Sequence, residues 1–237
     1  MKAILLAAGL GTRLRPLTNS IPKCLVDING KPLLDYWLEK LDKLGVTRIL
    51  INTHYMPESI QRHIEQSPYR NIIEIAHEEA LLGTGGTLIK HREFWQDSAT
   101  IVAHADNFTT SSLADMVKQH NQSPEIDATL LTFYTNNPKE CGIIEHNEEG
   151  IITGFHEKIE NPPSNLASGA LVILNPNTYT RYFKMHESST LEVDLSRDIL
   201  PNMLGRMKIW NVNQTYIDIG NITNYQLANQ IAQQDNL

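Results

Sequence analysis

The sequence predicts an α/β fold, and two observations along the chain lead to that prediction. In the first half, short unbroken apolar runs alternate with segments whose apolar residues recur at helical spacing. Such alternation is typical of a parallel sheet covered by helices. After residue 105 the pattern changes, because two apolar runs flank Asn147-Glu148-Glu149-Gly150, a turn signal that favours a β-hairpin. We therefore expect a doubly wound, mostly parallel Rossmann-like sheet with a mixed second half, in a single compact domain.

Each element is predicted from its local pattern. Residues 3–8 are an unbroken apolar run, as expected for a strand that is buried on both faces, so a strand is predicted over residues 2–8. The spacing of leucines and Trp37 predicts a helix over 32–44, which begins at Pro32 and ends at Gly45. The same reasoning predicts strands at 48–53, 72–76, 100–105, 127–134, 142–146, 151–155, 166–175, 207–212 and 215–219, and helices at 57–66, 84–91, 111–120, 176–183, 193–200 and 222–233.

Charge is distributed unevenly along the chain. The net charge of -7 argues against a partner such as nucleic acid, which needs a general basic face. Residues 1–31 nevertheless carry five basic side chains against one acidic side chain, Asp27. A basic beginning on an acidic protein indicates a site for a small anion.

Cellular location is predicted from the absence of a membrane helix, a signal peptide and a disulfide framework in the sequence. The first apolar run is too short for a membrane helix and has no signal-peptide arrangement around it. Two cysteines, Cys24 and Cys141, do not make a disulfide framework in a chain of 237 residues. We expect a cytoplasmic protein with no membrane partner.

The loop after the first strand is the strongest candidate for chemistry. Gly9 and Gly11 allow backbone amides to approach phosphate, and Arg13 adds planar, permanently charged donors. Lys23 follows ten residues later as a second cation, which suits a polyphosphate. A dinucleotide fingerprint would need glycine where the chain has Leu14, and no P-loop run occurs. The remaining alternative is a mere strand-to-helix connection, although such connections are usually shorter.

Four segments resemble one family. Leu6-Ala7-Ala8-Gly9-Leu10-Gly11-Thr12-Arg13-Leu14-Arg15-Pro16-Leu17-Thr18, followed by Pro22-Lys23, is similar to the signature of sugar-1-phosphate nucleotidyltransferases, also called nucleotide-sugar pyrophosphorylases. Ala105-Asp106-Asn107, Glu157-Lys158 and Ile217-Asp218-Ile219-Gly220 resemble its later landmarks, in the same order. The resemblance implies one nucleotidyltransferase domain of the nucleotide-diphospho-sugar transferase type over 1–237, with a nucleotide-binding half (1–110) and a sugar-phosphate-binding half (111–237).

The resemblance also implies roles for single residues. Arg13, Lys23 and Lys158 are the expected catalytic cations, and Asp106 and Asp218 are expected to bind Mg²⁺. The expected sugar-binding residues are Gly142, Glu157 and Asn165. The expected nucleotide-binding residues are Leu6, Ala8, Gly9, Gly11, Thr12, Gly83, Thr84 and Gly85, of which the last three are expected to offer free amides ahead of a helix.

Several of these residues also have a plain structural interpretation. Asp106, at the end of a strand, suits a turn or a helix N-cap, and Lys158 alone suits a solvated lysine. Asp218 lies between two isoleucines, where burying a carboxylate is costly unless a charge meets it. Asp194 and Asp198, four residues apart on a predicted helix, suit an acid pair, a sugar contact or a solvated edge beside Arg197.

The predicted activity is transfer of a nucleotidyl group from an NTP to a sugar 1-phosphate, giving an NDP-sugar and pyrophosphate. The segment Leu82-Gly83-Thr84-Gly85-Gly86-Thr87 resembles guanylyltransferases that act on mannose or heptose 1-phosphates, so GTP is the expected nucleotide. The alternatives are a cytidylyl- or uridylyltransferase for another sugar phosphate or phosphocholine on the same scaffold, and a non-catalytic nucleotide-sugar sensor. A small assembly such as a homodimer is expected.

Overall fold

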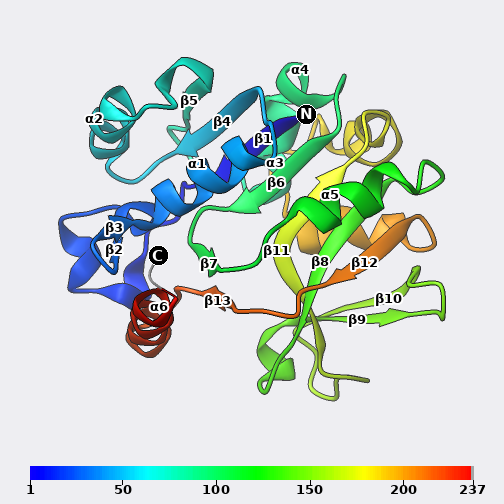
Figure 1. Ribbon diagram of the computed structural model, residues 1–237. Coiled ribbons are helices and arrows are strands. Elements are labelled where there is room, and N and C mark those ends of the chain that lie inside the picture. The colour runs from blue at the N-terminus through cyan, green and yellow to red at the C-terminus, as the bar shows by residue number, and fades with distance from the viewer. Residues whose placement is uncertain (236–237) are drawn as a thin grey trace. The chain divides into compact units, whose positions relative to one another are not determined.

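The computed structural model describes residues 1–235, which form two compact units interleaved along the chain (Figure 1). Unit 1 contains Met1–Leu81, Ala103–Ser112 and the described residues from Gln214 onward, and unit 2 contains Leu82–Val102 and Leu113–Asn213. The predicted halves, 1–110 and 111–237, follow this division only in part. Among residues 1–235, no helix has the length and apolar content needed to cross a membrane.

Unit 1 is built around parallel strands, as the sequence predicts. β1 (Lys2–Leu6) pairs in parallel with β4 (Arg48–Thr53), which pairs in parallel with β5 (Ile73–His77). The chain passes into unit 1 along β6 (Thr100–His104), and the amide of Ala105 then donates to the carbonyl oxygen of Leu6 at 3.0 Å. The middle of β1 is fully buried, which explains its unbroken apolar run.

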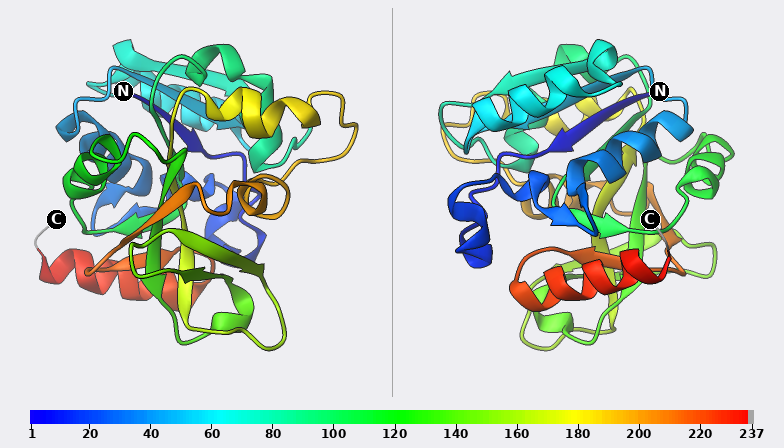
Figure 2. Two further views of the ribbon diagram at one scale, coloured as in Figure 1. Left: turned by 90° about the vertical axis from the view of Figure 1, so that its right-hand side faces the viewer. Right: turned by 60° about the vertical axis from the view of Figure 1, so that its left-hand side comes forward.

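Three helices belong to unit 1: α1 (Leu33–Lys43), α2 (Pro57–Gln66) and α6 (Ile222–Gln234). Helix α1 buries its leucines and Trp37, whose indole N–H donates to the carbonyl oxygen of Asn107 at 2.8 Å. α2 begins with Pro57, where the missing amide costs no helical hydrogen bond. α6 buries Ala228 and Ala232 and can be followed at the C-terminal end of the chain in the right-hand view of Figure 2.

Two small antiparallel ribbons complete unit 1, and the sequence analysis missed most of both. β2 (Asp27–Ile28) pairs with β3 (Lys31–Pro32) across a turn at Asn29 and Gly30, whose φ angles are 54° and 84°. β7 (Asn107–Thr109) pairs with β13 (Tyr216–Asp218), of which only β13 was expected. Side chains from both ribbons, α1 and α6 share one buried apolar cluster: Leu14, Val26, Ile28, Leu33, Tyr36, Phe108, Ile217, Ile219, Ala228 and Ala232.

Unit 2 has the mixed sheet that the sequence predicts. β8 (Ala128–Tyr134) pairs antiparallel with β11 (Leu166–Leu174) and parallel with β12 (Met207–Asn211). β9 (Gly142–His146) and β10 (Ile152–Glu157) form an antiparallel hairpin around the expected turn, as the left-hand view of Figure 2 shows. The register places Glu157 opposite Gly142 and Ala167 of β11 opposite Ile143 of β9.

The helices of unit 2 differ from the prediction in length. α3 (Thr84–Lys90), α4 (Arg92–Trp95) and α5 (Ala114–Asn121) are regular. The helices expected at 176–183 and 193–200 are shorter π-type turns at Tyr179–Phe183 and Leu195–Ile199. Tyr179 and Phe183, in the first of these two turns, both pack against Trp95. Their ring centroids lie 5.8 and 5.1 Å from the ring centroid of Trp95.

Candidate active site

The loop after β1 is folded back on itself. Gly11 has a φ angle of 63°, and a Cβ there would lie 3.0 Å from Cγ2 of Thr18, so this position requires glycine. The Thr18 hydroxyl donates to the carbonyl oxygen of Gly11 at 2.6 Å, and the Tyr55 hydroxyl donates to the carbonyl oxygen of Thr18 at 3.0 Å. These two hydrogen bonds, one from within the loop and one from Tyr55, hold the loop in its folded-back conformation.

A cavity of about 290 Å³ lies against this loop. Residues 9–14 line it together with Lys23, Asp106 and Gly220, so the predicted Gly9, Gly11, Thr12, Arg13, Lys23 and Asp106 all face one space. Leu6 and Ala8 are buried where the loop leaves the strand. The Arg13 side chain is 73% exposed, which leaves its guanidinium available to an anion.

The antiparallel pairing of β7 and β13 brings the two predicted metal ligands together. Asp218 pairs with Asn107 in register, and the amide of Ile219 donates to the carbonyl oxygen of Asp106 at 3.0 Å. Ile217 and Ile219 point into the apolar cluster, while the Asp218 side chain points the other way and is 51% exposed. The alternation of side chains along a strand thus resolves how an aspartate fits between two isoleucines.

Lys23 lies between the two carboxylates. Its ammonium donates to Oδ2 of Asp106 at 2.5 Å and to Oδ1 of Asp218 at 3.1 Å, and its side chain is only 9% exposed. These two distances, 2.5 and 3.1 Å, place the carboxylate oxygens less than about 6 Å apart, close enough to share one octahedral ion. Arg13 adds a longer ion pair, with its Nη2 3.8 Å from Oδ2 of Asp218.

Charge compensation keeps Asp106 ionised. Burial alone would raise the pKa of this carboxyl, but the Lys23 ammonium beside it, with a smaller effect of His104, holds the pKa below its ordinary value. The carboxylate therefore carries its negative charge at neutral pH and can bind a cation.

The residues at this cavity fit a magnesium ion. Mg²⁺ binds through one or two carboxylates and completes its octahedron with water and substrate phosphates. Asp106 and Asp218 supply two carboxylates that converge on one cation at the wall of a cavity. Within the part of the chain that the structure describes, no group of three or more His, Cys, Asp or Glu side chains could enclose a metal by itself. A two-carboxylate site that shares its metal with a substrate matches this arrangement.

In unit 2, the structure brings together three of the residues predicted to contact the sugar phosphate. Glu157 ends β10 opposite Gly142, and a Cβ at position 142 would lie 2.7 Å from Oε2 of Glu157, so the glycine makes room for the carboxylate. Lys158 follows, 65% exposed, with its ammonium 3.4 Å from Oε1 of Glu157. Asn165 is exposed just before β11, and its carbonyl oxygen accepts the amide of Thr135 at 3.0 Å.

The expectation of free amides ahead of α3 is wrong for Gly85 and Gly86. The amides of Gly85 and Gly86 donate to the carbonyl oxygen of Val193 at 2.8 and 3.0 Å, and the Thr84 hydroxyl donates to Asp194 at 3.1 Å. The sequence shows small residues but not the distant segment that comes to lie against them. The amides of Gly85 and Gly86 are therefore not free to bind a nucleotide.

Two residues near the cavity were missed by the sequence analysis. Asn52, at the end of β4, accepts the amide of Ala7 at 2.8 Å and donates to Oε1 of buried Glu78 at 3.2 Å, so it holds the start of the loop. In the sequence, the signal that could have identified Asn52 was its position as a polar residue at the end of the apolar run of β4. At Gly220, a Cβ would lie 2.6 Å from Oδ2 of Asp218 and 3.2 Å from Nη2 of Arg13, which explains the glycine after Ile219.

Comparison with known proteins agrees with this architecture. The family model described as nucleotidyl transferase matches residues 2–235. The chain is 31% identical over 227 residues to mannose-1-phosphate guanyltransferase beta-A of Xenopus laevis, covering 93% of this chain and 61% of that protein. It is also 31% identical over 202 residues to UTP–glucose-1-phosphate uridylyltransferase AglF of Haloferax volcanii, covering 84% of this chain and 82% of that protein.

A solved structure extends the comparison to the fold. The structure of apo-UDP-glucose pyrophosphorylase superposes with a TM-score of 0.85 at 22% identity, covering 100% of both chains. This similarity confirms the expected fold, a mostly parallel α/β sheet with a mixed second part, of the nucleotide-diphospho-sugar transferase type. The chain spans 61% of the length of the Xenopus guanylyltransferase, about three fifths.

Proposed function

The chain belongs to the nucleotidyl transferase family, and from this premise we propose that it joins an NTP to a sugar 1-phosphate, giving an NDP-sugar and pyrophosphate. The observation that carries the proposal is the convergence of Lys23, Asp106 and Asp218 at a cavity lined by the glycine loop. Both substrates are anions, so the reaction depends on positioning them and neutralising their charge. A cavity with two cationic side chains and two carboxylates for a metal supports that chemistry.

The proposed mechanism assigns each cation to one phosphate group. A sugar-phosphate oxygen attacks the α-phosphorus of the NTP in line, and pyrophosphate leaves from the opposite side. Arg13, exposed at the cavity, binds the triphosphate, and Lys23 neutralises charge at the reacting phosphoryl group. Lys158, beside Glu157, binds the phosphate of the sugar. No side chain forms a covalent intermediate.

Mg²⁺ is the proposed cofactor, held by Asp106 and Asp218. When bound, it supplies positive charge that polarises phosphoryl oxygens and stabilises the transition state. Asp106 would hold the ion at the wall of the cavity that loop residues 9–14 also line, and Asp218 would supply the second carboxylate.

Gly142, Glu157 and Asn165 are the proposed contacts of the sugar ring. Gly142 leaves room for the Glu157 carboxylate, whose oxygens can accept hydrogen bonds from sugar hydroxyls. A carboxylate accepts such bonds in pairs, so it distinguishes sugars by the position of their hydroxyls.

GTP with a mannose- or heptose-type 1-phosphate is the proposed substrate pair. Support comes from the resemblance of residues 82–87 to guanylyltransferases and from relatives such as the Xenopus protein, whose name gives mannose 1-phosphate as its substrate. UTP with glucose 1-phosphate is the second candidate, because AglF is named for that reaction and matches this chain over 82% of its own length.

A pyrophosphate-release assay tests the proposal. GTP, UTP, CTP, ATP and dTTP are each combined with mannose, glucose and heptose 1-phosphates and with phosphocholine, with and without Mg²⁺. We expect the highest turnover with GTP and a mannose- or heptose-type substrate. Highest turnover with UTP and glucose 1-phosphate would favour the second candidate. Absence of turnover with every combination, while calorimetry shows nucleotide binding, would instead indicate a non-catalytic sensor.

Variants of the two aspartates test the metal site. Asp106→Asn and Asp218→Asn should each abolish Mg²⁺-dependent turnover, because an amide is a far weaker ligand for a hard cation than a carboxylate. The melting temperature should stay close to that of the wild type. Asp115→Asn on the exposed side of α5 is the matched control and should keep full activity. A large loss of stability in either site variant would mean that the carboxylates are structural.

The cytoplasmic location and the homodimer remain predictions. Cell fractionation and size-exclusion chromatography with light scattering test them directly.

A further inference from the structure

The segment at the start of α3 is hydrogen-bonded to a part of unit 2 that is distant in the sequence. The amide of Val193 donates to the carbonyl oxygen of Leu82 at 3.1 Å, and the carbonyl oxygen of Val193 accepts the amides of Gly85 and Gly86. A Cβ on Gly83 would lie 2.5 Å from that same oxygen. Helix α3 has no side-chain cap of its own, so a backbone carbonyl from another segment caps it. We call residues 82–86 the glycine segment and residues 192–198 the clasp.

Thr84 and Asp194 supply the side-chain part of this junction. The Thr84 hydroxyl donates to Oδ2 of Asp194 at 3.1 Å and accepts the amide of Leu195 at 2.7 Å. The other oxygen of Asp194, Oδ1, accepts the amides of Ser196 and Arg197 at 2.9 Å each. One carboxylate therefore caps the turn that follows it and, at the same time, holds the first residue of α3.

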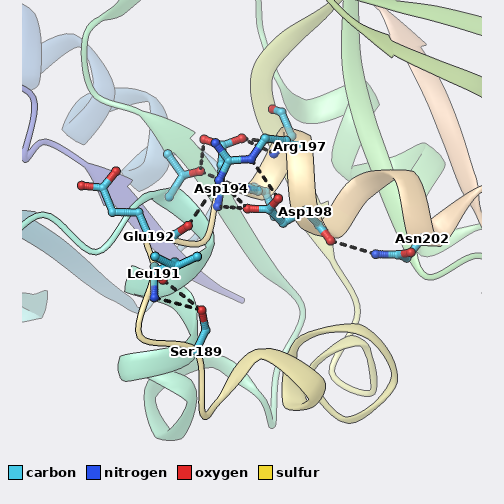
Figure 3. Close-up of polar contacts among 10 residues, drawn as sticks. Ser189, Leu191, Glu192, Asp194, Arg197, Asp198 and Asn202 are labelled. Atoms are coloured by element: carbon cyan, nitrogen blue, oxygen red, sulfur yellow. Dashed lines mark hydrogen bonds and ion pairs between the residues drawn. The ribbon is translucent and has the colours of Figure 1, made fainter.

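The rest of the clasp is braced independently of the glycine segment. Arg197 makes two hydrogen bonds to Asp198, at 2.9 and 2.8 Å, and one to the carbonyl oxygen of Glu192 (Figure 3). Asp198 accepts the amide of Asp194 at 2.7 Å. The Arg197 side chain is 61% exposed and that of Asp198 is 26% exposed, so Asp198 is a partly buried partner of Arg197. Asp194 instead faces Thr84.

We propose that Asp194 is a positioning residue for nucleotide recognition, acting through Thr84 on the backbone of the glycine segment. The inference rests on the proposed function and on the expectation that Gly83, Thr84 and Gly85 bind the nucleotide. A segment already held in one conformation loses less freedom when a ligand binds to it, so the contact of Asp194 with Thr84 raises nucleotide affinity without touching the nucleotide. Phosphoryl transfer itself does not depend on the clasp, because Lys23, Asp106 and Asp218 carry it.

The first test removes the Thr84 hydroxyl. Thr84→Val keeps the side-chain volume close to that of threonine but can neither donate to Asp194 nor accept the amide of Leu195. We expect KM for the NTP, and Kd for the nucleotide by calorimetry, to rise about tenfold. The kcat value should stay within about twofold of the wild type, because the loss affects binding alone. Thr84→Ser, which keeps the hydroxyl, should restore both constants.

A double-mutant cycle separates this role from the capping of the turn. Asp194→Ala loses the cap as well as the contact with Thr84, so it should also raise KM. If the two residues act through their shared hydrogen bond, the double variant should raise KM by less than the product of the two single effects, although it also loses the bond from the Leu195 amide to Thr84. Arg197→Gln is the matched control, since it loosens the clasp without removing a contact to the glycine segment, and it should leave KM unchanged.

The outcomes distinguish the inference from the function on which it rests. An active wild type whose Thr84→Val variant keeps its KM, or whose Arg197→Gln variant raises KM equally, would overturn the inference and leave the function standing. The inference would also be overturned if the KM increases of the two single variants multiplied in the double variant. A wild type that neither binds nucleotide nor turns over any substrate pair would overturn both.

Discussion

At the scale of single residues, Lys23 is the side chain on which the site depends. Its nearly buried ammonium meets Asp106, in the turn before β7, and Asp218, on β13. A buried charge that keeps one partner stays compensated, whereas a buried charge with no partner is strongly destabilising. The contribution of either carboxylate to stability therefore depends on whether the other is present.

This dependence predicts non-additive stability losses. Asp106→Asn and Asp218→Asn should each lower the free energy of unfolding by about 1 kcal/mol, while the double variant should lower it by about 3 kcal/mol or more. Urea denaturation monitored by circular dichroism measures all three. Replacing Lys23 with Met in the double variant should recover part of the loss, because it removes the uncompensated charge. Simple addition of the two single effects would contradict this explanation.

Lys158 gives a second prediction at the same scale. Lys158→Gln should raise KM for the sugar 1-phosphate about tenfold or more while leaving KM for the NTP near the wild-type value, because it removes one ionic contact to the sugar phosphate. Steady-state kinetics with each substrate varied in turn measures the difference. Lys139→Gln is the control, since Lys139 is 60% exposed and pairs with Glu160. Equal effects of the two variants would place Lys158 outside the sugar-phosphate site.

At the scale of elements, the first turn of α6 supports the site from behind β13. The Asn221 side chain caps α6 by accepting the amide of Asn224 at 2.8 Å, and the Asn224 side chain donates to the carbonyl oxygen of Asp218 at 2.7 Å. The helix therefore holds the backbone of Asp218, one of the two proposed metal ligands. Its position in turn depends on Ala228 and Ala232, small enough to pack closely in the apolar cluster.

Loss of this cap has a predictable cost. Asn221→Ala should lower the free energy of unfolding by about 1 kcal/mol, the usual contribution of an N-cap. Asn224→Ala should in addition raise the Mg²⁺ concentration needed for half-maximal turnover, because it releases the backbone of Asp218. Denaturant titration and a Mg²⁺ titration of turnover measure the two effects. Gln226→Ala, at an exposed position of the same helix, should change neither.

The elements also show which patterns predict structure reliably. The bounds of β4 and α2 were predicted as observed, because a short run centred on Ile49, Leu50 and Ile51 and an N-terminal proline mark them locally. The ribbons β2–β3 and the strand β7 were missed, because strands of two or three residues are too short to show a period. The approach of Val193 to the glycine segment could not be predicted, since it joins positions far apart in the chain and depends on tertiary packing.

At the scale of the whole molecule, acid stability depends on a buried carboxylate in unit 2. The Asp127 side chain is 6% exposed and accepts hydrogen bonds from Arg181, Tyr182 and Arg206. Burial alone would raise the pKa of Asp127, but the hydrogen bonds from Arg206, Tyr182 and Arg181 hold it below the ordinary value of 3.8. The folded state thus stabilises the ionised form of Asp127, because the unfolded chain lacks these hydrogen bonds.

The sign of the pH dependence follows from that shift. The contribution of Asp127 is fully present above the unfolded pKa of 3.8 and is lost as the pH falls through the lower folded pKa. The free energy of unfolding should therefore fall below about pH 4, and Asp127→Asn should weaken this dependence while lowering stability at neutral pH. Urea midpoints between about pH 2 and pH 7 measure it. Asp115→Asn should leave the slope unchanged.

The order in which the chain is synthesised sets a limit on when this protein can begin to work. Unit 1 takes its two aspartates from separate stretches, and the second of them lies on β13, close to the end of the described chain. A nascent polypeptide emerging from the ribosome thus completes every segment of unit 2 before it can pair β13 with β7. Until then Lys23 has one acidic neighbour and not two, and the centre that would hold magnesium is still only half assembled.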